Sequence, residues 1–187
     1  MCAFFRVILF FLFIFTLSQR EVVAQTKFWV ENQYTVKNGN ITPKIDGLFF
    51  GTIPGAGRFG TYGWFQADNG YAQAYFGPTF MTTSWSQVGT AVGLEQGSTT
   101  PRFGSFFWAG KGGNYLVVLF DEAGGSGRWY KIETKISILK IAGLGPFRQA
   151  FLGTGVRAEI EIPKTPVKFW GVLTVDRRGA FAIRFNF

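Results

Sequence analysis

Histidine is absent from this 187-residue chain, and its single cysteine, Cys2, lies near the start. Nucleophilic triads that use histidine as base and histidine-based metal sites are therefore excluded, and no thiol is left for catalysis beyond the first residues. Paired carboxylates remain, as Asp121 with Glu122 and as Glu159 with Glu161. On one face of a strand, Glu159 and Glu161 would lie about 6.5 to 7 Å apart, a separation compatible with acid and base roles in glycoside hydrolysis. Salt bridging is the favoured role for them, so we predict no enzyme, cofactor or metal site.

A glycine-rich stretch, Gly51 to Arg58, has the composition of a phosphate-binding loop. It lacks the Gly-Lys-Ser/Thr ending and a following helix, so it is interpreted as a plain turn. Basic residues also lie beside other turns, where they could contact lipid or lipopolysaccharide headgroups at a membrane rim or simply solubilise strand ends. These residues are Arg58, Arg102, Lys111, Arg128, Arg177 and Arg178.

The stretch from Arg128 to Ile162 carries charges at every second position on one face and aliphatic residues on the other, the pattern of strands with a polar and an apolar side. The charged residues predicted to face the inside are Lys131, Glu133, Lys135, Arg157, Glu159 and Glu161, joined by Lys168 and Arg184 on the last two strands. A hairpin register in which paired residue numbers sum to 290 would place Glu133 opposite Arg157 and Lys131 opposite Glu159.

Eleven strand candidates follow one another, separated by short turns such as Asn38-Gly39 and Asp68-Asn69-Gly70. There is no amphipathic helix and no repeat of fixed period. The chain is therefore predicted to be an all-β, antiparallel, up-and-down closed β-barrel. Because single-chain bacterial barrels have an even number of strands, 10 to 12 strands are expected, with the first strand and the Pro43 region the weakest. After Gly143-Leu144-Gly145-Pro146, which is interpreted as a turn, the chain returns as one long strand.

The first 24 residues have a positive charge at Arg6, an apolar run from Val7 to Leu17 and a small residue, Ala24, before Gln25. This is the pattern of a cleaved signal peptide. Residues 25–187 are then a single domain, and the formal net charge falls from +8 to +7. An exported basic domain does not normally meet nucleic acid, so the expected partners are anionic lipid or an anionic solute.

The last residues alternate strictly, with Phe181, Ile183, Phe185 and Phe187 on one face. This stretch resembles the closing strand of bacterial outer-membrane β-barrels, which typically ends on Phe. The resemblance covers about one strand. It implies a transmembrane barrel in the outer membrane of a Gram-negative bacterium, with these four residues as the signal read by the barrel-assembly machinery. Trp and Tyr residues near strand ends suit an aromatic girdle.

Two functions remain open at this point. The first is an outer-membrane barrel, either a small porin-like pore or a structural membrane protein, with a weakly cationic lumen that accepts a small anionic solute. The second is a periplasmic or secreted lipocalin-like barrel that binds a lipid, another apolar ligand or a sugar in an aromatic cavity. The candidate strands favour the first function, since most reach the roughly 9 to 11 residues that a tilted membrane-crossing strand needs.

Overall fold

The computed structural model describes residues 27–53 and 55–187, so the predicted leader and Cys2 lie outside the described part of the chain. Twelve strands make up the described region. In chain order they are β1 (Lys27–Lys37), β2 (Asn40–Thr52), β3 (Phe59–Asp68), β4 (Tyr71–Thr83), β5 (Ser86–Glu95), β6 (Arg102–Lys111), β7 (Asn114–Ala123), β8 (Trp129–Leu139), β9 (Ala142–Gln149), β10 (Gly153–Glu161), β11 (Val167–Thr174) and β12 (Gly179–Asn186).

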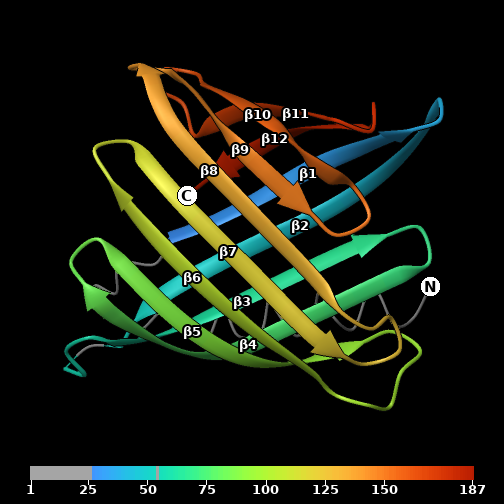
Figure 1. Cartoon of the computed structure of the whole chain (residues 1–187). Helices are drawn as coiled ribbons and strands as arrows, with labels where there is room; N and C mark the ends of the chain where they lie inside the picture. The colour runs from blue at the N-terminus through green and yellow to red at the C-terminus, as the bar shows by residue number, and fades with distance from the viewer. Residues whose placement is uncertain (1–26, 54) are drawn as a thin grey trace.

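Each strand pairs antiparallel with the next, and β12 pairs with β1, which closes the sheet into a barrel (Figure 1). The predicted all-β, up-and-down closed barrel is confirmed, with 12 strands. The first strand and the Pro43 region, expected to be the weakest, form β1 and β2, where Tyr34 is paired with Pro43. No helix in the described region is long and apolar enough to cross a membrane.

Short turns produce this meander. Asn38 and Gly39, between β1 and β2, both have positive φ, 52° and 78°. Two successive residues of positive φ form the hairpin turn whose twist matches that of the flanking strands. Gly112 and Gly113, between β6 and β7, have φ of 62° and 83° and do the same.

The strand that the sequence did not predict is β9. Its Gly143 and Gly145 have no side chain on the inner face, and this makes a strand look like a turn in the sequence. A Cβ on Gly143 would lie 2.7 Å from Cγ of Lys135, so the glycine leaves room for that lysine to cross over β9. Because β9 pairs with both β8 and β10, the predicted register between Arg128–Ile138 and the return strand is wrong.

The two ends of the barrel differ in what they carry. At one end, called the terminal end here, the start of β1 lies beside the end of the chain: Phe187 N donates to Phe28 O at 2.7 Å, and Phe28 N donates to Phe187 O at 3.2 Å. The turns β2–β3, β4–β5, β6–β7, β8–β9 and β10–β11 share this end. The far end carries the other six turns, including the longer connections β5–β6 and β7–β8.

Candidate functional site

The eight charged residues that the sequence predicted to face inward lie in one group of ion pairs inside the barrel. Arg157 contacts Glu133 at 3.1 Å and Glu159 at 3.0 Å, and Lys131 contacts Glu133 at 3.0 Å. Glu133 and Arg157 thus share the inner side although β9 separates their strands. Lys131 and Glu159, predicted to face each other, are paired with different residues. With Glu31, the eight residues form what we call the cross-barrel network: Glu31, Lys131, Glu133, Lys135, Arg157, Glu159, Glu161, Lys168 and Arg184.

Glu31 on β1 is the network member that the sequence did not single out. Its Oε2 accepts hydrogen bonds from Nε of Arg184 at 2.7 Å and from Nε1 of Trp170 at 2.8 Å, and the residue is fully buried. Glu31 is directly opposite Arg184 in the β1–β12 register, a pairing of the first strand with the last. The sequence signal that could have found it is the period of two along β1, which places Glu31 on the same face as Trp29 and Gln33. Its partner Arg184 comes next to it only when β12 pairs with β1 and closes the barrel.

Several contacts of the network reach across the lumen instead of along the sheet. Lys131 on β8 extends to Glu31 on β1, with Nζ 3.8 Å from Oε1, and Arg184 on β12 approaches Glu133 on β8 at 3.7 Å. Neither pair of strands is adjacent in the barrel. Arg157 also stacks on Trp170, at 4.2 Å from the ring centre, and Arg184 on Trp29, at 4.1 Å. Side chains from opposing walls therefore fill the middle of the barrel in this region.

A second ionic group, the Arg102 cluster, lies at the far end on strands β4 to β7 and on the β7–β8 connection. It consists of Tyr75, Glu95, Arg102, Asp121 and Ser126. Arg102 is 0% exposed. Its guanidinium donates to Tyr75 Oη at 2.5 Å, to Glu95 at 2.7 Å, to Gly127 O at 2.7 Å, and also to Asp121 and Ser126. Burial therefore excludes both roles that the sequence left open for Arg102, contact with lipid headgroups and solubilisation of a strand end.

The Arg102 cluster holds the β7–β8 connection, residues 124–128, in place through hydrogen bonds. Glu95 accepts hydrogen bonds from the backbone N of Gly125 at 3.1 Å and of Ser126 at 3.2 Å. Gly124 has φ of 67°, and a Cβ there would lie 2.4 Å from Oε2 of Glu95. The connection thus packs directly against the charged pair, which fixes it at the mouth of the barrel.

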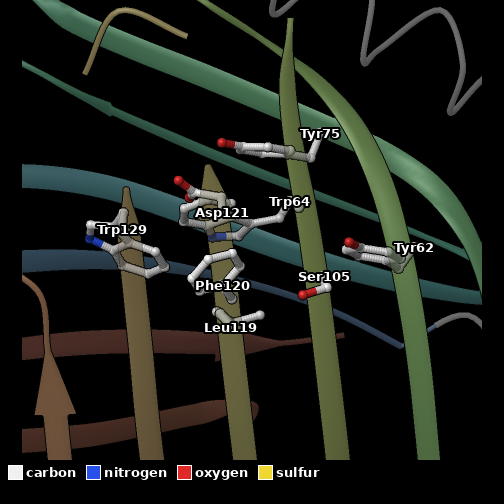
Figure 2. A pocket seen from close by; sticks show the side chains of 9 residues that line it. Tyr62, Trp64, Tyr75, Ser105, Leu119, Phe120, Asp121 and Trp129 are labelled. Carbon is white, nitrogen blue, oxygen red and sulfur yellow. The ribbon is translucent and has the colours of Figure 1, made fainter. Parts of the chain in front are cut away.

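Aromatic side chains occupy the part of the interior that the ionic groups leave. Trp64 on β3 stacks against Trp129 on β8, with ring centres 5.1 Å apart, and against Tyr75 at 5.3 Å (Figure 2). Tyr62 and Leu119 lie in the same cluster. The cavity between these residues measures about 10 Å³, room for at most about one water molecule. This aromatic region is a packed core without space for an organic ligand.

Charges balance among the ion-paired residues of the described interior. Seven are basic and seven acidic: Lys44, Arg102, Lys131, Lys135, Arg157, Lys168 and Arg184 against Glu31, Asp46, Glu95, Asp121, Glu133, Glu159 and Glu161. The positive surplus of the chain lies elsewhere, mostly in or beside turns. Four exposed basic residues occupy turns or a strand end of the terminal end: Arg58, Lys111, Lys140 and Lys164.

Neither carboxylate pair has the setting of a catalytic acid and base. Asp121 points inward to Arg102, while Glu122 points outward to Arg128, so the two do not act on one substrate. Glu159 is held by Arg157, Lys135 and Lys168. Within residues 27–53 and 55–187, no three or more His, Cys, Asp or Glu side chains are arranged so that they could hold a metal ion.

The predicted assembly signal lies on the outer face of β12. Phe181, Phe185 and Phe187 are exposed, and Ile183 is half-buried. Two ring pairs join this strand to β1: Phe181 with Tyr34 at 5.0 Å and Phe187 with Phe28 at 5.9 Å. The residues therefore help to hold the seam between the first and last strands. Their role in assembly stays a prediction.

Comparison with solved structures identifies porins of the same fold. A KdgM porin superimposes with a TM-score of 0.55 at 12% identity, covering 85% of this chain and 98% of its own. A KdgM porin in complex with disordered oligogalacturonate gives 0.56 at 11% identity, with the same coverage. No protein-family model matches the sequence, and no curated protein matches it. At these identities the similarity concerns the barrel fold.

Proposed function

We propose that this chain is a porin-type barrel of a Gram-negative outer membrane, exported by the leader of residues 1–24. The observation that carries the proposal is the reversed distribution of side chains, with charges buried inside and large apolar residues exposed outside. Val92, Phe103, Ile136, Val156 and Leu173, spread over five strands, are each more than half exposed. Soluble monomers rarely expose contiguous apolar patches beyond a few hundred Å², whereas lipid covers such a surface.

The proposed activity is slow, non-enzymatic passage of small anionic solutes. Because the ion-paired interior is balanced, the anion preference arises from basic residues at the barrel ends instead of from a cationic lumen. The preference is therefore weak, and the conductance is low because side chains of the cross-barrel network span the lumen. A KdgM porin with bound oligogalacturonate, an anionic sugar, supports a solute of this kind.

The lipocalin-like alternative has lost its main support. It needs an aromatic cavity that admits a ligand, and the rings around Trp64 are packed together. It also needs a polar outer surface, and the outer surface is apolar. No observation on the described residues favours it over the membrane barrel.

Membrane insertion is tested by fractionation together with gel mobility. We expect the mature chain in the outer-membrane fraction, with a folded form that migrates differently from the heat-denatured form. A mature protein that stays monomeric in buffer without detergent contradicts the proposal. Partners of the outer barrel surface are then outer-membrane lipid and lipopolysaccharide.

Transport is tested by conductance of the purified barrel in planar bilayers. Small single-channel steps with a modest preference for chloride over potassium are expected from the basic barrel ends. Strong cation selectivity contradicts the proposed activity, and a complete lack of steps from inserted barrel leaves a structural membrane protein as the function.

The assembly role of the last strand has its own test. Deleting Phe187 removes the last residue of the predicted signal and its ring contact with Phe28. We expect the variant to be exported but to accumulate outside the membrane, as unfolded protein in the periplasmic fraction. The matched control is Phe103→Ala, which removes an exposed outer ring on β6 away from the seam. Normal assembly of the Phe187 deletion contradicts the role.

A further inference from the structure

The terminal end of the barrel holds a hollow of about 390 Å³ beside the cross-barrel network. Its wall includes Lys135, Ser137, Lys140 and Glu161 together with Gly112 and Gly113 of the β6–β7 turn. Lys135 and Glu161 are network members, so the hollow opens directly onto paired charges. It is wide enough for a small organic ion, unlike the packed aromatic core.

Two carboxylates share the lysines at this place, and they are held very differently. Glu159 is buried and bound by Arg157, Lys135, Lys168 and the hydroxyl of Tyr115, at 2.6 to 3.2 Å. The side chain of Glu161 is 41% exposed and, within the described residues, forms ion pairs with two lysines, Lys135 at 2.6 Å and Lys168 at 3.1 Å. Glu159 is therefore a fixed part of the wall, whereas the carboxylate of Glu161 can move away from Lys135 and Lys168.

The position of Glu161 in the chain lets its side chain separate from the two lysines without movement of the backbone. It is the last residue of β10, and its backbone N donates to Ile141 O at 2.7 Å, so the backbone stays anchored while the side chain rotates. The carboxylate of Glu161 is already partly exposed, so water can solvate it once it separates from the two lysines. Once Glu161 turns away, Lys135 and Lys168 still share Glu159, and Lys140 adds a further positive charge on the wall of the hollow.

We propose that Lys135 and Lys168 form a binding site for the carboxylate group of a solute, and that Glu161 occupies this site as a tethered stand-in. The inference rests on the proposed function, since it names the class of anion that the barrel accepts: a small carboxylate, bound at the terminal end. Solute and Glu161 exchange on the two lysines, which keep Glu159 as a common partner throughout. Because Glu161 competes with the solute for the two lysines, it lowers the apparent affinity of the barrel for the solute.

Binding of trifluoroacetate to the detergent-solubilised barrel, followed by ¹⁹F NMR, tests the site. Glu161→Gln removes the tethered competitor, and we expect the affinity for trifluoroacetate to rise on the order of tenfold, as for removal of a competitor present at millimolar effective concentration. Lys135→Met combined with Glu161→Gln should abolish the gain. The matched control is Glu122→Gln, an exposed carboxylate paired with Arg128 on the outer face, which should leave the affinity unchanged. Neutral trifluoroethanol should not respond to any of these changes.

Equal trifluoroacetate affinity in Glu161→Gln and Glu122→Gln overturns the site, as does a gain that survives the loss of Lys135. The folded state of each variant is checked by its heat-modifiable gel mobility. Variants that keep this mobility but show no gain disprove the carboxylate site alone and leave the membrane barrel standing. A wild-type chain that needs no detergent disproves the membrane barrel itself, and the site with it.

Discussion

The cross-barrel network and the Arg102 cluster both bury charges inside the barrel, but they connect different parts of it. The network joins opposing walls, because its contacts run from β8 to β1 and from β12 to β8. The Arg102 cluster is local: one guanidinium on β6 donates to partners on β4, β5 and β7 and on the connection that follows β7. The network therefore determines how the walls pack against each other, and the cluster determines the conformation of one loop.

If the network holds the walls, its most buried cation should have the largest effect on stability. Arg157→Ala leaves Glu133 and Glu159 without their shared arginine and removes the stacking on Trp170. Breaking a buried ion pair from one side costs about 3 to 5 kcal/mol. We expect that loss in the free energy of unfolding, measured by urea titration of the barrel in lipid vesicles.

The matched control for Arg157 is Arg148→Ala, on the outer face of β9. Arg148 is exposed, and its guanidinium lies 5.5 Å from the ring centre of Tyr130, a contact of about 0.5 to 1 kcal/mol. Similar losses for both arginines would mean that the network does not join the walls, and the contrast with the Arg102 cluster would disappear.

The Arg102 cluster should show a smaller global effect and a sharper local one. Arg102→Ala leaves Asp121 and Glu95 without their cation, at an expected cost of about 2 to 3 kcal/mol, since Glu95 keeps the backbone N–H groups of Gly125 and Ser126 as donors. The β7–β8 connection loses its anchor at Ser126 and Gly127. Brief trypsin treatment should therefore cut after Arg128 in the variant and leave the wild-type connection intact. Uncut variant protein would show that the loop is held by other contacts.

The same contrast explains what could be predicted from the sequence. Strands and their inner faces follow from a period of two in the sequence. The closed barrel and the inward charges on β8 and β10 could therefore be predicted. The strand β9 could not be predicted, because Gly143 and Gly145 carry no side chain on the inner face and Pro146 is typical of a turn. The turn that precedes Arg102 predicts a residue at the surface, either at a membrane rim or at a solvated strand end. Its burial depends on Glu95 and Asp121, which reach it only through the pairing of β5, β6 and β7. Glu31 likewise needs closure of the barrel.

The smallest expected effect comes from a residue adjacent to the cluster. Asp121 and Glu122 follow each other on β7, but Asp121 is buried against Arg102, and Glu122 forms an outer pair with Arg128 at 2.9 Å, with both side chains more than half exposed. Glu122→Gln should cost about 0 to 1 kcal/mol and leave the trypsin pattern unchanged, because water replaces the lost partner. Asp121→Asn removes the same charge one position earlier, and it should both destabilise the barrel more and expose the connection to trypsin. If the two substitutions behave alike, the anchoring of the loop does not depend on buried charge, and the Arg102 cluster contributes no more than an ordinary surface ion pair.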